Sequence, residues 1–255
     1  MRVSSGMGNK LKTALITGAS GGIGRAVAEK LAKDGYFIIA QYNSNPSGIE
    51  LLLESLDKSG LKDCVCAYKC DLSDSASIDE FIKEVKKSFK SIDVIVNNAG
   101  VGLYKLITDT TDAEWDKVFS VNMKRAFKIT NGFLKEMIVN QRGKIVNISS
   151  MWGLVGASME VAYSASKSAL IGYTKALAKE LAPSGINVNC VCPGVIDTPI
   201  NARFSKEDMA ALKDETPLGR IGKPKDVAEL VAFLCSDNSD FITGQIIACD
   251  GGFTL

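Results

Sequence analysis

The 255-residue sequence predicts an α/β protein, a single doubly wound domain in which helices cover both faces of a seven-stranded parallel sheet. Short runs rich in β-branched residues alternate with longer amphipathic segments, which is typical of consecutive β-α-β units. The strand-like runs lack an alternation of polar and apolar residues, as expected where helices cover both faces of a sheet. Because residues 11–255 carry this pattern without a linker, we expect one domain there.

Seven segments have the length and composition of buried strands. In chain order they are TALIT (13–17), FIIAQY (37–42), CVCAYKC (64–70), IDVIVNN (92–98), GKIVNIS (143–149), INVNCVC (186–192) and GQIIACD (244–250). The helices expected between them include residues 23–35, 77–89, 113–140 and 161–182. Residues 193–222 form the only long irregular stretch, and we expect a lid or substrate loop there because long loops in compact domains usually serve function.

Charge and composition exclude several functional classes. The formal net charge is +1 and the charges are interspersed, so no basic surface for nucleic acid is predicted. No apolar run approaches the roughly 20 residues that span a bilayer, and residues 1–10 lack the apolar core of a secretory signal. We therefore expect residues 1–10 to form a flexible tail, and the protein to act in the cytoplasm without binding a membrane.

The seven cysteines are an odd number for a disulfide framework, and most of them lie in predicted strands. Cys-x-Cys in a strand places both thiols on one face, without the loop that separates pairs of metal ligands. Since the sequence contains no histidine, we predict small buried cysteines and no bound metal.

A glycine-rich turn, TGASGGIG at residues 17–24, follows the first predicted strand and opens a helix. Its glycines permit a tight bend and let backbone N–H groups approach a pyrophosphate, which then sits at the positive end of the helix. The turn therefore predicts a dinucleotide site. The expected contacts come from Gly18, Ser20, Gly22, Ile23 and Gly24.

The TGxxxGxG spacing resembles that of the short-chain dehydrogenase/reductase family, and the resemblance continues to the C-terminus. The NNAG segment at 97–100 resembles the family signature that stabilises the sheet and lines the adenosine side. Asp71 and Leu72 match the family's adenine-contacting position after the third strand. The resemblance implies a Rossmann-type fold whose cofactor contacts include Asp71, Leu72, Asn98, Ala99 and Gly100.

Tyr163 and Lys167 lie four residues apart on a predicted helix, and therefore on one face. A neighbouring ammonium favours the phenolate, which suits a tyrosine for proton exchange with an alcohol or ketone. With Ser150 and Asn122, they match the family's catalytic tetrad. The resemblance implies that Ser150 holds the substrate oxygen, Tyr163 donates the proton, Lys167 binds the nicotinamide ribose, and Asn122 anchors a water that links Lys167 to solvent.

PGVIDT at residues 193–198 resembles the family's PGxIxT stretch. In that stretch the residue at Ile196 contributes a backbone contact to the nicotinamide carboxamide, and Thr198 contributes its hydroxyl. Pro-Gly is also a common opening of any loop after a strand. The contacts implied there come from Pro193, Gly194, Ile196 and Thr198.

The residues after the second strand favour NADP(H) as the cofactor. An acid at this point would bond the ribose 2′-hydroxyl and repel a 2′-phosphate, but residues 41–45 read QYNSN and contain no carboxylate. The arginine that the family often carries within the glycine turn is replaced by Gly21. This leaves Asn43, Ser44 and Arg25 as candidates to meet the phosphate.

Several substrate classes stay open within the family: a 3-oxoacyl thioester, a 5-aminopentanone group on elongation factor P, or another small ketone, sugar or steroid. Over nearly the whole chain the sequence is most similar to bacterial 3-oxoacyl-acyl-carrier-protein reductases, through GKIVNISSMWG, YSASKSAL, PLGRIGKPKDVA and ITGQIIACDGG. The positions of that subgroup's carrier-docking arginines hold Gln141 and Ser184. A different basic surface for an acyl carrier protein would come from Arg125, Lys128, Arg142 and Lys144.

MWGLVGASMEVAYSASK also resembles reductases of a 5-aminopentanone group attached to elongation factor P. There Glu160 would meet the substrate ammonium, whereas the alternative is a solvated residue that complements the helix dipole. The alternative class is an inactive binding or regulatory protein, against which the intact tetrad argues. We also expect a homotetramer with contacts through residues 113–140, 161–182 and the C-terminus, because the second of these helices is apolar around much of its circumference.

Overall fold

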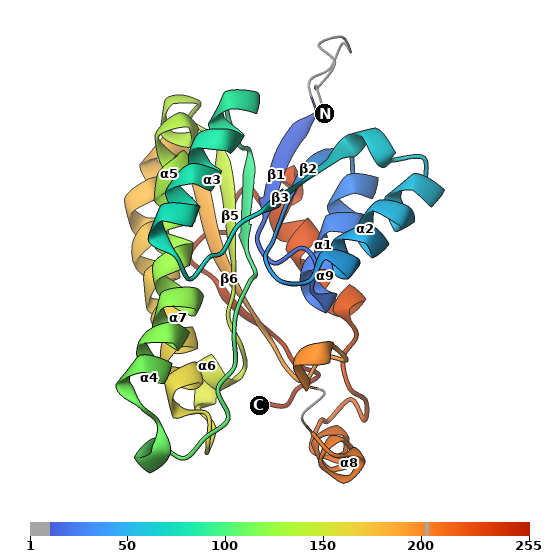
Figure 1. Cartoon of the computed structure of the whole chain (residues 1–255), viewed down its shortest axis with the longest axis vertical. Helices are drawn as coiled ribbons and strands as arrows, with labels where there is room; N and C mark the ends of the chain where they lie inside the picture. The colour runs from blue at the N-terminus through green and yellow to red at the C-terminus, as the bar shows by residue number, and fades with distance from the viewer. Residues whose placement is uncertain (1–10, 202–203) are drawn as a thin grey trace.

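The computed structural model describes residues 11–201 and 204–255, and the expected tail at 1–10 lies outside them. Their fold is a seven-stranded sheet with the order β3-β2-β1-β4-β5-β6-β7, and every strand pair in it is parallel (Figure 1). The predicted fold class is therefore confirmed. The strands are β1 (Lys12–Ile16), β2 (Tyr36–Tyr42), β3 (Val65–Lys69), β4 (Val94–Asn97), β5 (Gly143–Ile148), β6 (Ile186–Pro193) and β7 (Ile246–Cys249).

Helices cover both faces of this sheet (Figure 1). On one face lie α1 (Gly22–Lys33), α2 (Pro46–Lys58) and α9 (Pro224–Cys235), and on the other lie α3 (Ser75–Ser88), α4 (Asp112–Phe119), α5 (Arg125–Val139) and α7 (Val161–Leu181). Side chains alternate along β1, so that Ala14 and Ile16 join the core against α1 while Leu15 joins the core against α5. These two cores explain why the strand sequences are apolar throughout.

The predicted helix at 113–140 is divided in the structure. A π-helical turn, Ser120–Lys124, separates α4 from α5 and carries Asn122. The backbone stays helical across it, with dihedral angles near −60° and −45° at Ser120 and Arg125, so the apolar periodicity does not reveal the extra residue in the turn. Such turns frequently occur at functional sites.

Two helices that pack on the sheet, α2 and α9, were not among the predicted ones. The opening of α2 reads Pro-Ser-Gly, which is typical of a turn. In the structure Asn45 caps the helix by accepting a hydrogen bond from Gly48 N at 3.0 Å, and Pro46 takes the first helical position, where its missing N–H costs nothing. The capping residue Asn45, and not the composition of the helix opening, was the sequence signal for α2.

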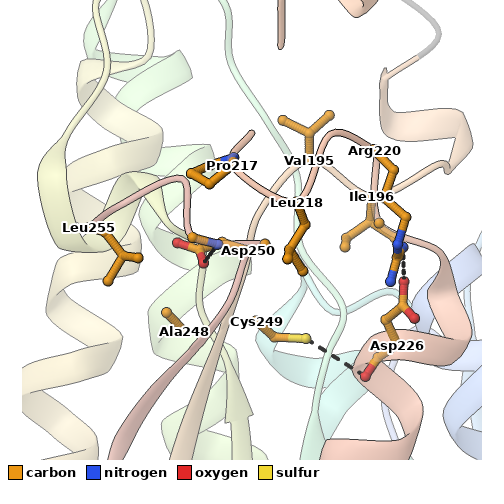
Figure 2. A pocket seen from close by; sticks show the side chains of 13 residues that line it. Val195, Ile196, Pro217, Leu218, Arg220, Asp226, Ala248, Cys249, Asp250 and Leu255 are labelled. Carbon is orange, nitrogen blue, oxygen red and sulfur yellow. Dashed lines mark hydrogen bonds and ion pairs between the residues drawn. The ribbon is translucent and has the colours of Figure 1, made fainter. Parts of the chain in front are cut away.

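The stretch predicted as irregular, residues 193–222, contains the helix α8 (Lys206–Asp214). A capping box between Ser205 and Asp208 starts it. At the far end of the stretch Arg220 Nη1 lies 2.6 Å from Asp226 Oδ2, and Figure 2 shows the two side chains facing each other. That residues 193–222 act as a lid or substrate loop stays a prediction.

Among the described residues no helix combines the length and apolarity needed to cross a bilayer. All seven cysteines carry free thiols, and Cys190 and Cys192 are buried side by side in β6. Within residues 11–201 and 204–255, no group of three or more cysteine, aspartate or glutamate side chains is placed so that it could hold a metal ion.

Candidate active site

The glycine turn between β1 and α1 forms one wall of the site. Gly18 has a φ of +68°, a conformation that residues with a β-carbon rarely adopt. A β-carbon on Gly24 would collide with Gly18 O and would lie 2.6 Å from Asn98 Nδ2. One on Gly22 would lie 2.6 Å from Thr198 Cγ2. The turn therefore requires glycine because its own backbone and two neighbouring loops approach it closely.

The NNAG segment after β4 is fixed to the end of β1. Thr17 Oγ1 accepts hydrogen bonds from the backbone N–H groups of Asn98 and Ala99 at 3.0 and 3.1 Å, and Asn98 Nδ2 donates to Thr17 O at 2.9 Å. One residue earlier, Asn97 Nδ2 donates to Asn147 Oδ1 at 2.9 Å, which ties β4 to β5. The segment thus forms a rigid floor beside the glycine turn.

Ser150, Tyr163 and Lys167 gather at the carboxyl end of β5. The Ser150 hydroxyl lies just beyond the strand and accepts a hydrogen bond from Trp152 N at 3.2 Å. Tyr163 and Lys167 project from α7, with Lys167 Nζ 5.6 Å from the centroid of the tyrosine ring. The ammonium also donates to Ile148 O at 2.8 Å, which holds it in place behind the phenol.

Burial and, after it, the charge of the nearby Arg125 guanidinium lower the pKa of the Lys167 ammonium to about 8. The Lys167 side chain is only 3% exposed. A cation in so dry a position acts strongly on its neighbours, because little water screens it. A cation in this position favours a phenolate nearby, so the arrangement suits proton transfer to or from a carbonyl oxygen held near Ser150.

Asn122 lies behind this group rather than on the cavity surface. Its side chain is fully buried; Val101 N donates to Asn122 Oδ1 at 2.9 Å, and Asn122 Nδ2 donates to Ser166 Oγ at 2.9 Å. The π-helical turn presents this amide to the loop after β4 and to α7 at once. Of the four predicted catalytic residues, it is the one that does not line the cavity.

One cavity of about 680 Å³ joins these parts. Its lining includes Ser150 and every residue expected from the sequence to contact the cofactor except Arg25. These cofactor candidates are Gly18, Ser20, Gly22, Ile23, Gly24, Asn43, Ser44, Asp71, Leu72, Asn98, Ala99, Gly100, Tyr163, Lys167, Pro193, Gly194, Ile196 and Thr198.

The cavity fits a dinucleotide on two structural grounds. The space above the glycine turn is one that β-carbons would fill, and the N-terminus of α1 opens into it. At the other end the exposed Asn43 and Ser44 follow β2 without a carboxylate between them and α2. Arg25, a candidate partner for a 2′-phosphate, does not line the cavity and lies 3.9 Å from Glu29 instead.

Asp71 lines the same end, and hydrogen bonds from the backbone and side chain of Ser73 lower the pKa of its carboxyl group. Lys117, which was not among the predicted site residues, also lines the cavity, and its charge lowers the pKa of Asp71 as well. Asp71 and Leu72 are the two residues expected to contact the adenine, and Lys117 lines the cavity with them.

Two charged residues lie where the sequence did not place them. Arg125 was expected on a carrier-docking surface, but it is 1% exposed, lines the cavity and donates a hydrogen bond to Ala99 O. Its spacing of four from Ile129 and eight from Phe133, both buried, was the available signal. Lys144 is buried too, with its Nζ atom 2.6 Å from Asp240 Oδ1, so the expected patch keeps only Lys128 and Arg142.

Glu160 is not a solvated helix-entry residue. It precedes α7 directly, is only 3% exposed and lines the cavity together with Tyr163. The expectation that it complements the helix dipole from solvent is therefore wrong.

Comparison with known proteins is consistent with this geometry. The chain is 41% identical over 241 residues to the 3-oxoacyl-[acyl-carrier-protein] reductase FabG of Aquifex aeolicus, covering 94% of this chain and 96% of that protein. It is 39% identical to FabG of Thermotoga maritima, covering 96% and 98%. A solved structure from Beutenbergia cavernae, provisionally assigned as an NAD(P)-dependent gluconate 5-dehydrogenase with bound NADP, superposes with a TM-score of 0.89 at 33% identity, covering 95% and 96%.

A family model described as enoyl-(acyl carrier protein) reductase matches residues 18–254, which is nearly the whole described chain. The match begins at the glycine turn and includes the NNAG floor, the Tyr163–Lys167 pair and the last strand. Together with the two reductases of about 40% identity, it shows that this chain belongs to the short-chain dehydrogenase/reductase family of oxidoreductases.

Proposed function

We propose that the protein catalyses the NADPH-dependent reduction of a ketone to a secondary alcohol, and that the ketone is a 3-oxoacyl thioester. The observation that carries the proposal is the placement of Ser150, Tyr163 and Lys167 on one cavity with the glycine turn. The names of the bacterial relatives support the thioester. An acyl carrier protein is the expected partner that presents it.

The proposed roles follow from the hydrogen-bonding capacity of each side chain. Ser150 donates its hydroxyl hydrogen to the substrate carbonyl oxygen, and Tyr163 donates its phenolic proton to the same oxygen as negative charge develops there. Lys167 binds the nicotinamide ribose and stabilises the phenolate that Tyr163 becomes. Asn122 anchors a water that returns a proton from solvent to Lys167. When bound, NADPH supplies the hydride that reduces the carbonyl carbon.

The preference for NADPH is proposed from the end of β2. Asn43 and Ser44 offer uncharged donors at the place where a carboxylate would repel a 2′-phosphate. The bound NADP in the Beutenbergia cavernae relative supports this choice.

A second substrate class is favoured by one observation. Glu160 is a buried carboxylate on the wall that carries Tyr163, and a buried carboxylate suits an ammonium group far better than an acyl chain. A 5-aminopentanone group on elongation factor P presents such an ammonium. Neutral sugars, sugar acids and steroids offer no ammonium for Glu160 to recognise.

A substrate panel tests both proposals. NADPH oxidation is followed spectroscopically with acetoacetyl and crotonyl thioesters of a carrier protein, a sugar ketone, and a lysine derivative bearing 5-aminopentanone. We expect acetoacetyl thioester to be the best substrate. If only the carbon–carbon double bond of the crotonyl thioester were reduced, the proposed ketone reduction would be refuted. If the lysine derivative bearing 5-aminopentanone were the best substrate, the second substrate class would be selected.

Glu160→Gln separates the two classes further. It should cost the amine substrate at least tenfold in kcat/KM and leave the acyl thioester within a few-fold. Glu84→Gln, which removes a carboxylate from the half-exposed face of α3, is the matched control.

For the assembly we propose a homotetramer acting in the cytoplasm, since free thiols suit a reducing compartment. In the described monomer Phe127 on α5 is 49% exposed and Leu255 is fully exposed, although Phe253 packs against Trp152 with 5.5 Å between ring centroids. Light scattering at micromolar concentration checks this. A fully active species near the 27.2 kDa monomer mass would contradict it.

A further inference from the structure

The Arg125 guanidinium is buried beside the cofactor cavity, although the proposed reaction gives it no task. Its side chain is 1% exposed, and its Nη2 atom donates a hydrogen bond to Ala99 O. Its Nε and Nη1 atoms have no hydrogen-bond partner among the described residues. A buried cation with unsatisfied N–H groups destabilises a fold, so its presence calls for a compensating role.

Arg125 and Lys167 approach consecutive residues of the same rigid floor. Arg125 bonds Ala99 O, while Lys167 Nζ lies 3.3 Å from the position that a β-carbon would take on Gly100. Both side chains line the cavity. Like charges that share a water-poor cavity wall repel each other, and Arg125 accordingly lowers the pKa of Lys167.

The other titratable groups around Lys167 do not reverse this balance. Tyr163 lies on its own helix, with Glu160 just before that helix. The Cys190 and Cys192 thiols face Lys167 from β6 and oppose the effect of Arg125 on its pKa, but less strongly than burial and Arg125 lower it. A hydrogen bond from the Cys190 thiol lowers the pKa of Cys192, whereas the pKa of Cys190 is raised.

We propose, resting on the proposed function, that Arg125 is a positioning residue: it fixes the floor that Lys167 also approaches, and its buried positive charge acts together with that of Lys167 to favour the phenolate of Tyr163. The guanidinium also holds Ala99, so the charge stays fixed relative to the floor. Two buried cations stabilise a phenolate more than one does. Tyr163 thereby becomes a stronger acid in ketone reduction and is a competent base for alcohol oxidation at lower pH.

Three variants test this. Arg125→Gln removes the charge but keeps an N–H donor for Ala99 O, and Arg125→Lys keeps the charge. Lys124→Gln removes one positive charge from the preceding residue, which is exposed and therefore screened by water. The alkaline limb of the kcat/KM profile for ketone reduction should move up by about one pH unit in Arg125→Gln and stay in place in the other two.

A measurement without substrate separates this inference from the proposed function. The ionisation of Tyr163 in the free protein is obtained as the tyrosinate absorbance difference between each protein and its Tyr163→Phe counterpart. A raised ionisation pH in Arg125→Gln, absent from Arg125→Lys and Lys124→Gln, supports the inference even if no tested ketone is reduced. An active wild type with identical Tyr163 titrations in all four proteins would overturn the inference and leave the proposed function standing.

Circular dichroism verifies the fold of each variant. If Arg125→Gln does not fold, Arg125→Met replaces it, because methionine also lacks the charge and fills part of the same space. Failure of both neutral variants to fold would also overturn the inference, since Arg125 would then be a structural cation. An equal shift in Arg125→Lys and Arg125→Gln would show that charge is not the cause.

Discussion

Replacing Asn43 by aspartate should erase or reverse the proposed preference for NADPH over NADH. Asn43 is exposed, follows β2 directly and lines the cavity next to Ser44. Its amide also donates toward the Asp71 carboxylate, with a small lowering effect on the pKa of that group. The substitution therefore introduces a negative charge at the point where a 2′-phosphate is expected, and beside an existing acid.

The magnitude follows from Coulomb's law at an exposed site. Two unit charges about 4 Å apart in water interact by about 1 kcal/mol, and a phosphate monoester carries a charge of about −2 near neutral pH. The repulsion is then about 2 kcal/mol, or roughly a 30-fold loss in NADPH affinity. NADH lacks the 2′-phosphate and is spared this term, while the new contact with Asp71 affects both cofactors alike.

The assay is the ratio of kcat/KM for NADPH to that for NADH, at low and at high salt. Asn131→Asp is the matched control, because Asn131 is exposed on α5, on the opposite face of the sheet from α2. The ratio should fall about 30-fold in Asn43→Asp, fall less at high salt, and not change in the control. Equal use of both cofactors by the wild type, or an unchanged ratio in Asn43→Asp, would refute the reasoning.

Three further outcomes are expected. Tyr163→Phe should lower turnover more than tenfold while the NADPH dissociation constant, measured by fluorescence, changes only a few-fold; a residual rate above one tenth would contradict its role as proton donor. Gly24→Ala should abolish cofactor binding, because the added β-carbon would collide with Gly18 O. The control is Gly172→Ala on α7, where the helical backbone has open space around it, and this variant should bind NADPH normally and melt at a slightly higher temperature. Equal NADPH affinity in the two variants would contradict the close approach at Gly24. Between pH 8 and 10.5 the free energy of unfolding of the wild type should rise relative to that of Lys167→Met. The reason is that the unfolded chain keeps the lysine proton over this range, whereas Lys167 in the folded chain has a pKa of about 8 and loses it. Urea titrations that show no such difference would disprove the lowered pKa.

The strands were predictable from sequence because each is apolar on both faces. β5 is buried at every position, so its composition alone marks it. The π-helical turn was not predictable, since its residues have ordinary helical dihedral angles and its effect depends on what α4 and α5 pack against. α2 was missed because Pro46 and Gly48 have low helix propensity, although the Asn45 cap outweighs them.

The residues of the candidate site were predictable where they directly follow a predicted strand. Residues after β1, β2, β4, β5 and β6 meet at one edge because all strands run in parallel. Burial of Glu160 was not predictable from the sequence pattern, and at Arg125 the only signal was its helical spacing from Ile129 and Phe133. Charged residues are read as exposed by default, and tertiary contacts overrode that default at both positions.

The strand order explains why these parts converge where they do. β1 lies between β2 and β4, so the chain leaves the sheet in opposite directions on the two sides of this boundary. The crevice that opens beyond the carboxyl ends of β1 and β4 is where ligands bind in such sheets. The glycine turn and the NNAG floor are those two ends, and the cavity spans them.

The charges deep in this crevice indicate what it is built to hold. Lys167 and Arg125 are both buried there, and the groups acting on Lys167 are a second cation and two thiols rather than a carboxylate. Such a site destabilises the empty protein, because like charges are kept apart from water. A ligand that brings ribose hydroxyls and phosphate charge to the same floor relieves that cost on binding. Cofactor binding and folding stability should therefore be strongly coupled, and the neutral Arg125 variants should be more stable than the wild type without cofactor but gain less from it.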